Sequence, residues 1–381
     1  MHILIYEPRR GGHHLSWLRY ITEDLLSAGH RLTLAIDGRK PAMAQYGEHL
    51  GDLLGQVAIT SVYASGNRIK GGSKLSALNA CFTHSQADHA LANNLDEFAS
   101  SMLRQASVGR MPPLSLKGKL SGVYFRPRFL ANPFWPLGNL PKQIGFNRLT
   151  SRGWFHRICL LDEYLFDRHR RRYQRAGLTF LPDPWSGAFN TSSALARERL
   201  GIPDDKWVLL HYGIGTRRKG LHLVIRAMLA PTCPGHWHLL CAGQLADDRQ
   251  ITAGLQTLSE DGRATVLDRY VSEADEAICF AAADIVLLPY VAHFGSSGVL
   301  SLSAAAGKMV VASDDGLIGR RVCEHHLGLC FNAGSSAELA HTLAAAETVL
   351  KTDEDAYRQA TRRYARTCNR QAFRDALVAL Y

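Results

Sequence analysis

The sequence predicts an α/β protein built from two doubly wound parallel-sheet domains, and three observations carry this prediction. The chain has 381 residues, which is too many for one ordinary hydrophobic core. Short apolar strands alternate with helical stretches in both halves, as parallel sheets with crossover helices require. The stretch "LPDP" at 181–184 separates the two series. We therefore expect a first domain over 1–183, a second over 184–355, and a ligand cleft at the carboxyl ends of the strands.

The first domain opens with a strand, a glycine turn, a helix and a second strand. "HILIYE" at 2–7 is a buried strand, and "PRRGGHH" at 8–14 is a turn. In the helix that follows, apolar residues recur near the 3.6-residue period, and Gly29 ends it. "HRLTLAID" at 30–37 is the next strand, which completes a βαβ unit. Further units are expected within 87–106, 120–129, 157–175 and 178–184.

The second domain begins with a polar helix at 193–203, after which short apolar strands alternate with helical stretches. The chain ends in an amphipathic helix that is rich in Arg, from about residue 355. Six strands are expected here, at 206–213, 236–243, 264–271, 284–291, 308–313 and 327–331.

The composition is that of a globular protein, with 46% apolar and 20% charged residues. No run of 18 apolar residues appears, and the first ten residues do not form a signal peptide, so we expect a cytoplasmic protein. The eight cysteines show no CxxC pairing, and we interpret them as reduced core residues rather than zinc ligands.

The net charge of +10 is concentrated in one segment, 98–161, which has ten Lys or Arg, nine aromatic residues and no acid. Such a segment suits an anionic membrane surface or a large anionic acceptor. A solvated basic face with its aromatics in the core remains the alternative. Nucleic acid would suit the charge, but the sequence lacks the signature of a nucleic-acid module. The candidate residues for the membrane or acceptor side are Arg126, Arg128, Trp135 and Trp154.

A cationic turn follows the first strand of the second domain, in "HYGIGTRRKG" at 211–220. The glycines Gly213 and Gly215 form the turn, and a helix opens near Gly220. Cations oppose the dipole at a helix N-terminus, so three of them there indicate an anionic ligand. A solvated basic turn is the alternative. The three cations are Arg217, Arg218 and Lys219.

A second turn lies in "HFGSSGVLSLSAAAGK" at 293–308, between an apolar strand and a helix of small residues. Ser296, Ser297 and the N–H groups near Gly298 form a neutral donor nest. The alternative is a plain serine N-cap. With Lys219 opposite, the two turns would form a clamp on a diphosphate.

The N-terminal turn "RRGGHH" at 9–14 allows close approach of the backbone to a ligand, but it is not the G-x-G-x-x-G of a dinucleotide site. His13 and His14 are candidates for proton transfer or sugar binding, unless they are structural. The sequence shows neither a convincing hydrolase pair of carboxylates nor a G-x-S-x-G elbow. It therefore favours group transfer over hydrolysis.

These motifs together resemble those of GT-B glycosyltransferases, most closely the family 4 type. The matches are "GGHH…LLSAGHRLTLAI", "G-x-G…RKG…RAM" at 213–228, "YVSEADEAICFAAADIVLLPY" at 270–290, and "HFGSSGVL…AAAGKMVVAS" at 293–313. The resemblance implies two Rossmann-like domains, a nucleotide sugar (a UDP-sugar) as co-substrate, no metal, no other cofactor and retention of configuration. It also implies that the last helix, 356–381, packs back on the first domain.

By the same resemblance, Lys219, together with Arg217 or Arg218, neutralises the diphosphate, and Gly12 lets the N-terminal loop close over the donor. His14 is our first candidate for the residue that contacts the transferring sugar. The family's two glutamates, spaced eight apart, would fall at Ala292 and Leu302, and neither position is acidic here. Hydroxyl groups of the donor must then find other acceptors, such as Ser303, His293 or backbone carbonyls. The remaining donor-binding candidates are Gly213, Gly215, Arg218, Phe294, Gly295, Ser296, Ser297 and Gly298.

We therefore expect a hexosyltransferase that acts on a glycan, a lipid-linked or a small-molecule acceptor, in polysaccharide or glycolipid biosynthesis. Its place would be the cytoplasm, with peripheral contact to the inner membrane face and no nucleic-acid partner. Two alternatives stay open at this point. One is a nucleotide-sugar epimerase of the same fold, and the other is a non-catalytic protein that binds sugar nucleotides or lipids.

Overall fold

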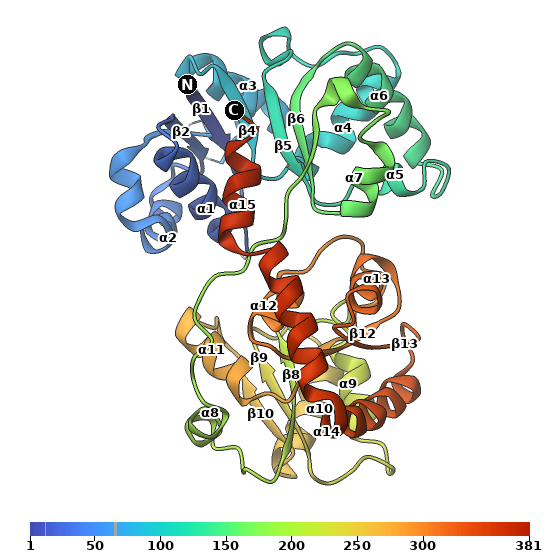
Figure 1. The fold of residues 1–381 in the computed structure, drawn as a ribbon. Coiled ribbons are helices and arrows are strands. Elements are labelled where there is room, and N and C mark those ends of the chain that lie inside the picture. Colours follow the sequence, from blue (N-terminus) through green and yellow to red (C-terminus); the bar gives the residue numbers. More distant parts are fainter. Residues whose placement is uncertain (12, 65–66) are drawn as a thin grey trace. The chain divides into compact units, whose positions relative to one another are not determined.

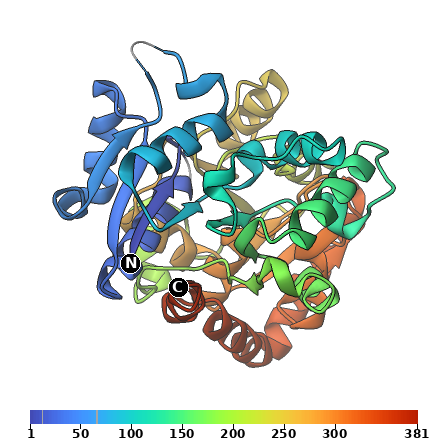
Figure 2. The same ribbon diagram turned by 90° about the horizontal axis from the view of Figure 1, so that it is seen from above.

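The structure, a computed structural model, describes residues 1–11, 13–64 and 67–381. It divides into two compact units (Figure 1). Unit 1 comprises Met1–Pro182 together with Phe373–Tyr381, and unit 2 comprises Asp183–Ala372. Both chain termini lie in unit 1, where Figures 1 and 2 show them close together.

Unit 1 contains a seven-stranded sheet in the order β3-β2-β1-β4-β5-β6-β7, and every strand pair in it is parallel. All five residues of β1 and of β5 are buried, because helices cover both faces of a doubly wound sheet. The strands are β1 (His2–Tyr6), β2 (Arg31–Ile36), β3 (Ala58–Ser61), β4 (His89–Ala92), β5 (Leu120–Tyr124), β6 (Phe155–Leu160) and β7 (Leu178–Phe180).

The helices of unit 1 pack their apolar sides on this sheet (Figure 1). On one face, Leu18 and Ile21 of the first helix join Phe373 and Leu377 near the C-terminus in one buried cluster. The α-helices are α1 (His13–Ser27), α2 (Lys40–Leu50), α3 (Lys74–Ser85), α4 (Asp96–Ser107), α5 (Arg128–Ala131), α6 (Asn139–Ser151) and α7 (Glu163–His169). Short 3₁₀ turns are η1 (Gly51–Gln56), η2 (Lys70–Gly72), η3 (Leu114–Leu116) and η4 (Gln174–Ala176).

Unit 2 contains a six-stranded sheet in the order β10-β9-β8-β11-β12-β13, again with parallel pairs throughout. The prediction of two doubly wound parallel sheets is confirmed. All six strands expected in this half are present, each shorter at one or both ends than the apolar run suggested. They are β8 (Trp207–Tyr212), β9 (Trp237–Ala242), β10 (Ala264–Leu267), β11 (Ile285–Leu288), β12 (Met309–Ser313) and β13 (Gly328–Phe331).

Four helices of unit 2 begin at side-chain caps: Ser192, Asp248, Ser272 and Ser335 each accept a backbone N–H of the first turn. Ser297 and Asp315 precede α12 and α13 without a side-chain cap bond. The helices are α8 (Ser193–Leu200), α9 (Leu221–Met228), α10 (Arg249–Glu260), α11 (Glu273–Ala282), α12 (Gly298–Ala305), α13 (Gly316–Glu324), α14 (Ser336–Thr367) and α15 (Arg370–Val378), which runs from unit 2 into unit 1.

The last two helices divide between the two units. The first unit ends at Pro182, and the chain returns to it from Phe373. Within α14, Ala360, Tyr364 and Ala365 are buried in the core of unit 2, so this helix belongs to unit 2 along its whole length. Only the last nine residues of the predicted segment 356–381 therefore join unit 1. Over the described ranges, no helix combines the length and the apolar character needed to cross a bilayer.

Candidate donor site

The two turns identified in the sequence leave neighbouring strands of the unit 2 sheet. The cationic turn follows β8, and the second turn follows β11. Strand β11 pairs with β8 in parallel, through Ile285 opposite Leu209 and Val286 opposite Leu210. Because parallel neighbours end at the same edge of a sheet, both turns start side by side at the carboxyl edge.

A glycine makes direct contact between the turns possible. The backbone N–H of Val291 donates to the carbonyl of Arg218 at 2.9 Å. Gly220, which precedes α9, lies against Pro289: a Cβ at position 220 would stand 1.7 Å from the Pro289 carbonyl oxygen. The φ angle of Gly220 is +75°, which L side chains rarely adopt. Only glycine therefore allows this close approach.

The three cations of the first turn have different partners. Arg218 Nη1 lies 2.8 Å from His293 Nδ1, so this guanidinium reaches across to the second turn. Lys219 Nζ donates to the Tyr212 carbonyl at 3.4 Å and lies 5.5 Å from the centre of the Tyr290 ring. Arg217 is half-exposed and pairs through Nε with Asp248 at 2.6 Å, at the start of α10. Arg218 and Lys219 are thus engaged on the side of the second turn, and Arg217 is engaged with α10.

A buried histidine of β8 forms a hydrogen bond with the backbone of the cationic turn. His211, in β8, is 1% exposed, and its Nε2 lies 3.3 Å from the Lys219 carbonyl. Burial and the nearby Lys219 charge lower the pKa of His211 to about 4. The ring is therefore neutral at pH 7, and its Nε2–H donates to that carbonyl.

The hydroxyl groups of the second turn are engaged within the protein. Ser297 Oγ lies 3.1 Å from the Tyr290 hydroxyl. Ser296 Oγ accepts from Arg321 Nη1 at 2.7 Å, and the same hydroxyl bonds to the Asp183 carboxylate. Ser303 is fully buried and donates to the Val299 carbonyl at 2.6 Å within α12. The backbone N–H of Leu300 donates to the Ser297 carbonyl at 3.0 Å. What this turn can offer an anion is therefore the N–H groups of Gly298 and Val299 at the start of α12, which have no acceptor in their own helix.

In unit 1, His14 belongs to a buried polar group at the carboxyl edge of the sheet. Its Nδ1 lies 3.3 Å from the carboxylate of Glu7, which directly follows β1. The Asn93 side chain, just after β4, donates to Glu7 at 2.7 Å and to the His14 carbonyl at 3.1 Å. Glu7 and Asn93 are fully buried. Gly12, expected to close over the donor, lies outside the described residues.

The residues expected on a membrane or acceptor side fall into two groups. Trp154 is 4% exposed and belongs to the interior of unit 1. Arg126 and Arg128 are exposed, and Trp135 is 70% exposed. Large apolar side chains gather around Trp135 on the surface of unit 1: Phe134, Trp135, Leu137, Leu140 and Ile144 are all exposed.

Sequence reasoning missed four residues of these networks: Glu7, Asn93, Asp183 and Arg321. For Glu7 and Asn93 a signal existed, because each polar side chain directly follows an apolar strand, and β1 and β4 are neighbours. Asp183 lies in the stretch "LPDP" that separates the two series of strands, and nothing near it in the sequence indicates its partners. Arg321 lies in the middle of α13, where the local sequence gives no sign of its partner.

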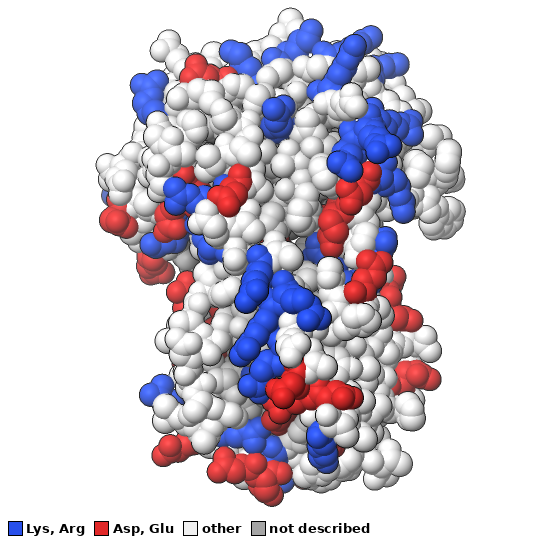
Figure 3. Space-filling model, in the orientation of Figure 1, with Lys and Arg blue, Asp and Glu red and all other residues white. Residues whose placement is uncertain are grey.

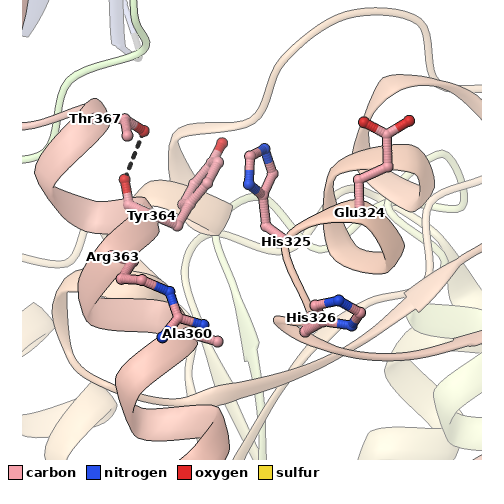
Figure 4. Close-up of a pocket in the computed structure, with 7 residues that line it drawn as sticks. All are labelled: Glu324, His325, His326, Ala360, Arg363, Tyr364 and Thr367. Atoms are coloured by element: carbon pink, nitrogen blue, oxygen red, sulfur yellow. Dashed lines mark hydrogen bonds between the residues drawn. The ribbon is translucent and has the colours of Figure 1, made fainter.

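A separate hollow lies on the surface of unit 2, between the end of α13 and the second half of α14 (Figure 4). Its volume is about 260 Å³. The rings of His325 and Tyr364 lie next to one another at the hollow, tilted by 54°, with centroids 5.0 Å apart. The lining residues are Glu324, His325, His326, Ala360, Arg363, Tyr364 and Thr367, and none of them belongs to either turn.

Known proteins resemble this chain in sequence over part of unit 2 and in overall fold. Residues 206–347 match the family model "Glycosyl transferases group 1". No curated protein sequence matches the chain. Among solved structures, Alr3699/HepE of Anabaena in complex with UDP and glucose is 16% identical, with a TM-score of 0.69, over 100% of this chain and 98% of that one.

Two further structures have the same architecture. Sucrose-phosphate synthase of Thermosynechococcus elongatus is 15% identical, with a TM-score of 0.69, over 100% of this chain and 98% of that one. WaaG, a glycosyltransferase involved in lipopolysaccharide biosynthesis, is 16% identical, with a TM-score of 0.67, over 100% and 99%. Residues 206–347 therefore match the group 1 glycosyltransferase family, and the chain as a whole has the GT-B fold.

Proposed function

We propose that the protein transfers a hexosyl group, with retention of configuration, from a UDP-sugar to a glycan, a lipid-linked or a small-molecule acceptor. The observation that carries the proposal is the direct contact between the cationic turn and the turn before α12. Alr3699/HepE, which has this fold, is described in complex with UDP and with UDP-glucose, and this supports UDP as the nucleotide.

The chemistry follows from charge. When the sugar bond breaks, the leaving diphosphate gains negative charge, and groups that are already oriented towards it stabilise the transition state. Lys219 and Arg218 supply positive charge, and the first N–H groups of α12 supply donors at the positive end of a helix dipole. We expect Arg217 to contribute less to this stabilisation, because its guanidinium is paired with Asp248.

His14 is our candidate for the group that contacts the transferring sugar. A carboxylate such as that of Glu7 can accept hydrogen bonds but cannot donate one. In a neutral His14 ring the proton therefore belongs on Nδ1, which faces Glu7. Nε2 is then an acceptor that suits a sugar hydroxyl. Glu7 and Asn93 hold the ring in this orientation.

The place of action that we propose is the cytoplasm, with peripheral contact to an anionic membrane surface. The exposed apolar residues around Trp135 support it, because each would otherwise stay in contact with water. Cations lie in the same segment: burial, and then the nearby charges of Arg104 and Arg128, lower the pKa of Lys142. Figure 3 shows Lys and Arg side chains gathered on the α6–α7 side of unit 1. This combination suits anionic headgroups.

The proposed reaction is tested by nucleotide binding followed by turnover. In a thermal-shift panel of nucleotides and nucleotide sugars, UDP and one UDP-sugar should raise the melting temperature, since a ligand that binds only folded protein stabilises it. Release of UDP that depends on an added acceptor would then identify a transferase. Turnover of the donor alone would favour an epimerase, and binding without any turnover would favour a non-catalytic protein; either result would contradict the proposal.

A further inference from the structure

Three segments of unit 2 meet at a buried polar cluster beside the second turn. Asp183, the first residue of the unit, is 8% exposed, and Arg321, in α13, is 3% exposed. Ser296 lies between them: its hydroxyl accepts from Arg321 Nη1 at 2.7 Å and bonds to the Asp183 carboxylate. The cluster therefore joins the start of the unit, the second turn and α13.

The direction of these hydrogen bonds follows from the chemistry of the three groups. A guanidinium only donates, so the Ser296 oxygen is the acceptor for Arg321. The single hydroxyl proton of Ser296 remains for the carboxylate of Asp183. Burial raises the pKa of Asp183, and the Ser296 bond and the Arg321 charge act in the opposite direction. A buried carboxylate without such partners would be costly, so each member of the cluster depends on the others.

The cluster also reaches the start of α12. A Cβ at Gly298, the first residue of α12, would lie 3.9 Å from Asp183 Oδ1, so the carboxylate lies against the positive end of that helix. The Ser301 hydroxyl, one turn further along, donates to the Asp183 carbonyl at 2.9 Å. Asp183 is thus attached to α12 at two points, through its side chain and through its backbone.

We infer that Asp183 and Arg321 are positioning residues, which hold the Ser296 turn and the start of α12 in the arrangement that binds the donor diphosphate. This inference rests on the proposed function. The turn has no acid at 292 or 302. The carboxylate beside it comes instead from the start of unit 2, and the balancing charge comes from α13. In this proposal Asp183 and Arg321 act through the turn and do not contact the donor themselves.

The test compares Arg321→Met, Arg321→Lys and Asp183→Asn with wild type in UDP titration calorimetry and in donor kinetics. A displaced turn should weaken UDP binding and raise the donor KM by roughly 10- to 100-fold, while the acceptor KM stays unchanged. The double variant Asp183→Asn/Arg321→Met should be no weaker than Arg321→Met, because it leaves no buried charge unpaired. If Arg321→Met does not fold, UDP affinity and donor KM are measured in Arg321→Lys, which keeps the charge but lacks the planar guanidinium.

A matched control is Arg197→Met. Arg197, at 8% exposed, forms a bidentate pair with the partly exposed Asp284, which precedes β11 and so lies at the opposite edge of the sheet from the turns. This variant should lose stability without any change in UDP affinity. Folded Arg321 and Asp183 variants that bind UDP and use the donor like wild type would overturn the inference.

Amide hydrogen exchange separates this inference from the proposed function, because it needs no ligand. In Arg321→Met, exchange over 293–300 should be faster than in wild type, and in Arg197→Met it should be unchanged there. If wild type binds no UDP but the exchange result holds, the proposed function fails and the positioning of the turn stands. If exchange over 293–300 is unchanged in Arg321→Met, the positioning role is refuted.

Discussion

Replacement of Lys219 by Met tests the role of the cationic turn. The substitution keeps the length of the side chain and removes its charge. Lys219 Nζ is held by the Tyr212 carbonyl and by the face of the Tyr290 ring, at the edge where both turns begin. A unit charge about 4 Å from a phosphate contributes about 4 kcal/mol at an effective dielectric constant of about 20. Loss of one strong transition-state donor costs about 2.7–4 kcal/mol, or roughly 10²–10³-fold in kcat.

The assay is initial-rate release of UDP from a UDP-sugar in the presence of acceptor. Arg217→Met is the matched control, because it removes a cation from the same turn that is paired with Asp248 on the surface. Its effect should stay below about fivefold, since an exposed ion pair contributes at most on the order of 1 kcal/mol. If Lys219→Met retained wild-type turnover, or if Arg217→Met lost as much as Lys219→Met, the assignment of the diphosphate to Lys219 would be refuted.

Three further predictions concern stability and surface contact. Gly220→Ala should lower the free energy of unfolding by roughly 3 kcal/mol in chemical denaturation, since the new Cβ meets the Pro289 carbonyl at a positive φ; an unchanged midpoint would contradict the contact. His211 has a folded-state pKa of about 4 against 6.5 in the unfolded chain. Its neutral ring therefore adds on the order of 3 kcal/mol to the free energy of unfolding above pH 6.5, relative to pH 4, and this part is lost as the pH falls towards 4. His211→Gln should flatten that part of the pH–stability curve, and a curve as steep as that of wild type would contradict it. Trp135→Ser should reduce flotation with anionic liposomes at low salt relative to the wild-type protein. Flotation equal to that of wild type would argue for a solvated basic face.

The fold could be predicted from the sequence because buried parallel strands leave a strong local signal. Segments such as "WHLLCA" of β9 are buried at every position and apolar at every position except His238. Strand β3 was missed because it forms the edge of the unit 1 sheet, and two of its four residues are exposed. The end of the chain was assigned to unit 1 as a single helix, but the non-polar side of α14 packs in unit 2 and only α15 crosses over.

The site could be predicted only in part, since local patterns locate turns but do not show their partners. The glycines and cations of 213–220 marked the first turn, yet nothing near Arg217 indicates its pairing with Asp248 on α10. Likewise the serines of 296–297 suggested free hydroxyl donors, and their engagement with Arg321 and Tyr290 depends on tertiary packing. Trp154 and Trp135 have similar basic surroundings in the sequence, but only Trp135 is exposed.

A crystal structure of the protein with UDP tests the central claim most directly. The account predicts that the diphosphate lies within hydrogen-bonding distance of both Lys219 Nζ and the backbone N–H groups at the start of α12. A diphosphate bound elsewhere, for example in the hollow lined by His325 and Arg363, or in contact with one turn alone, would contradict it.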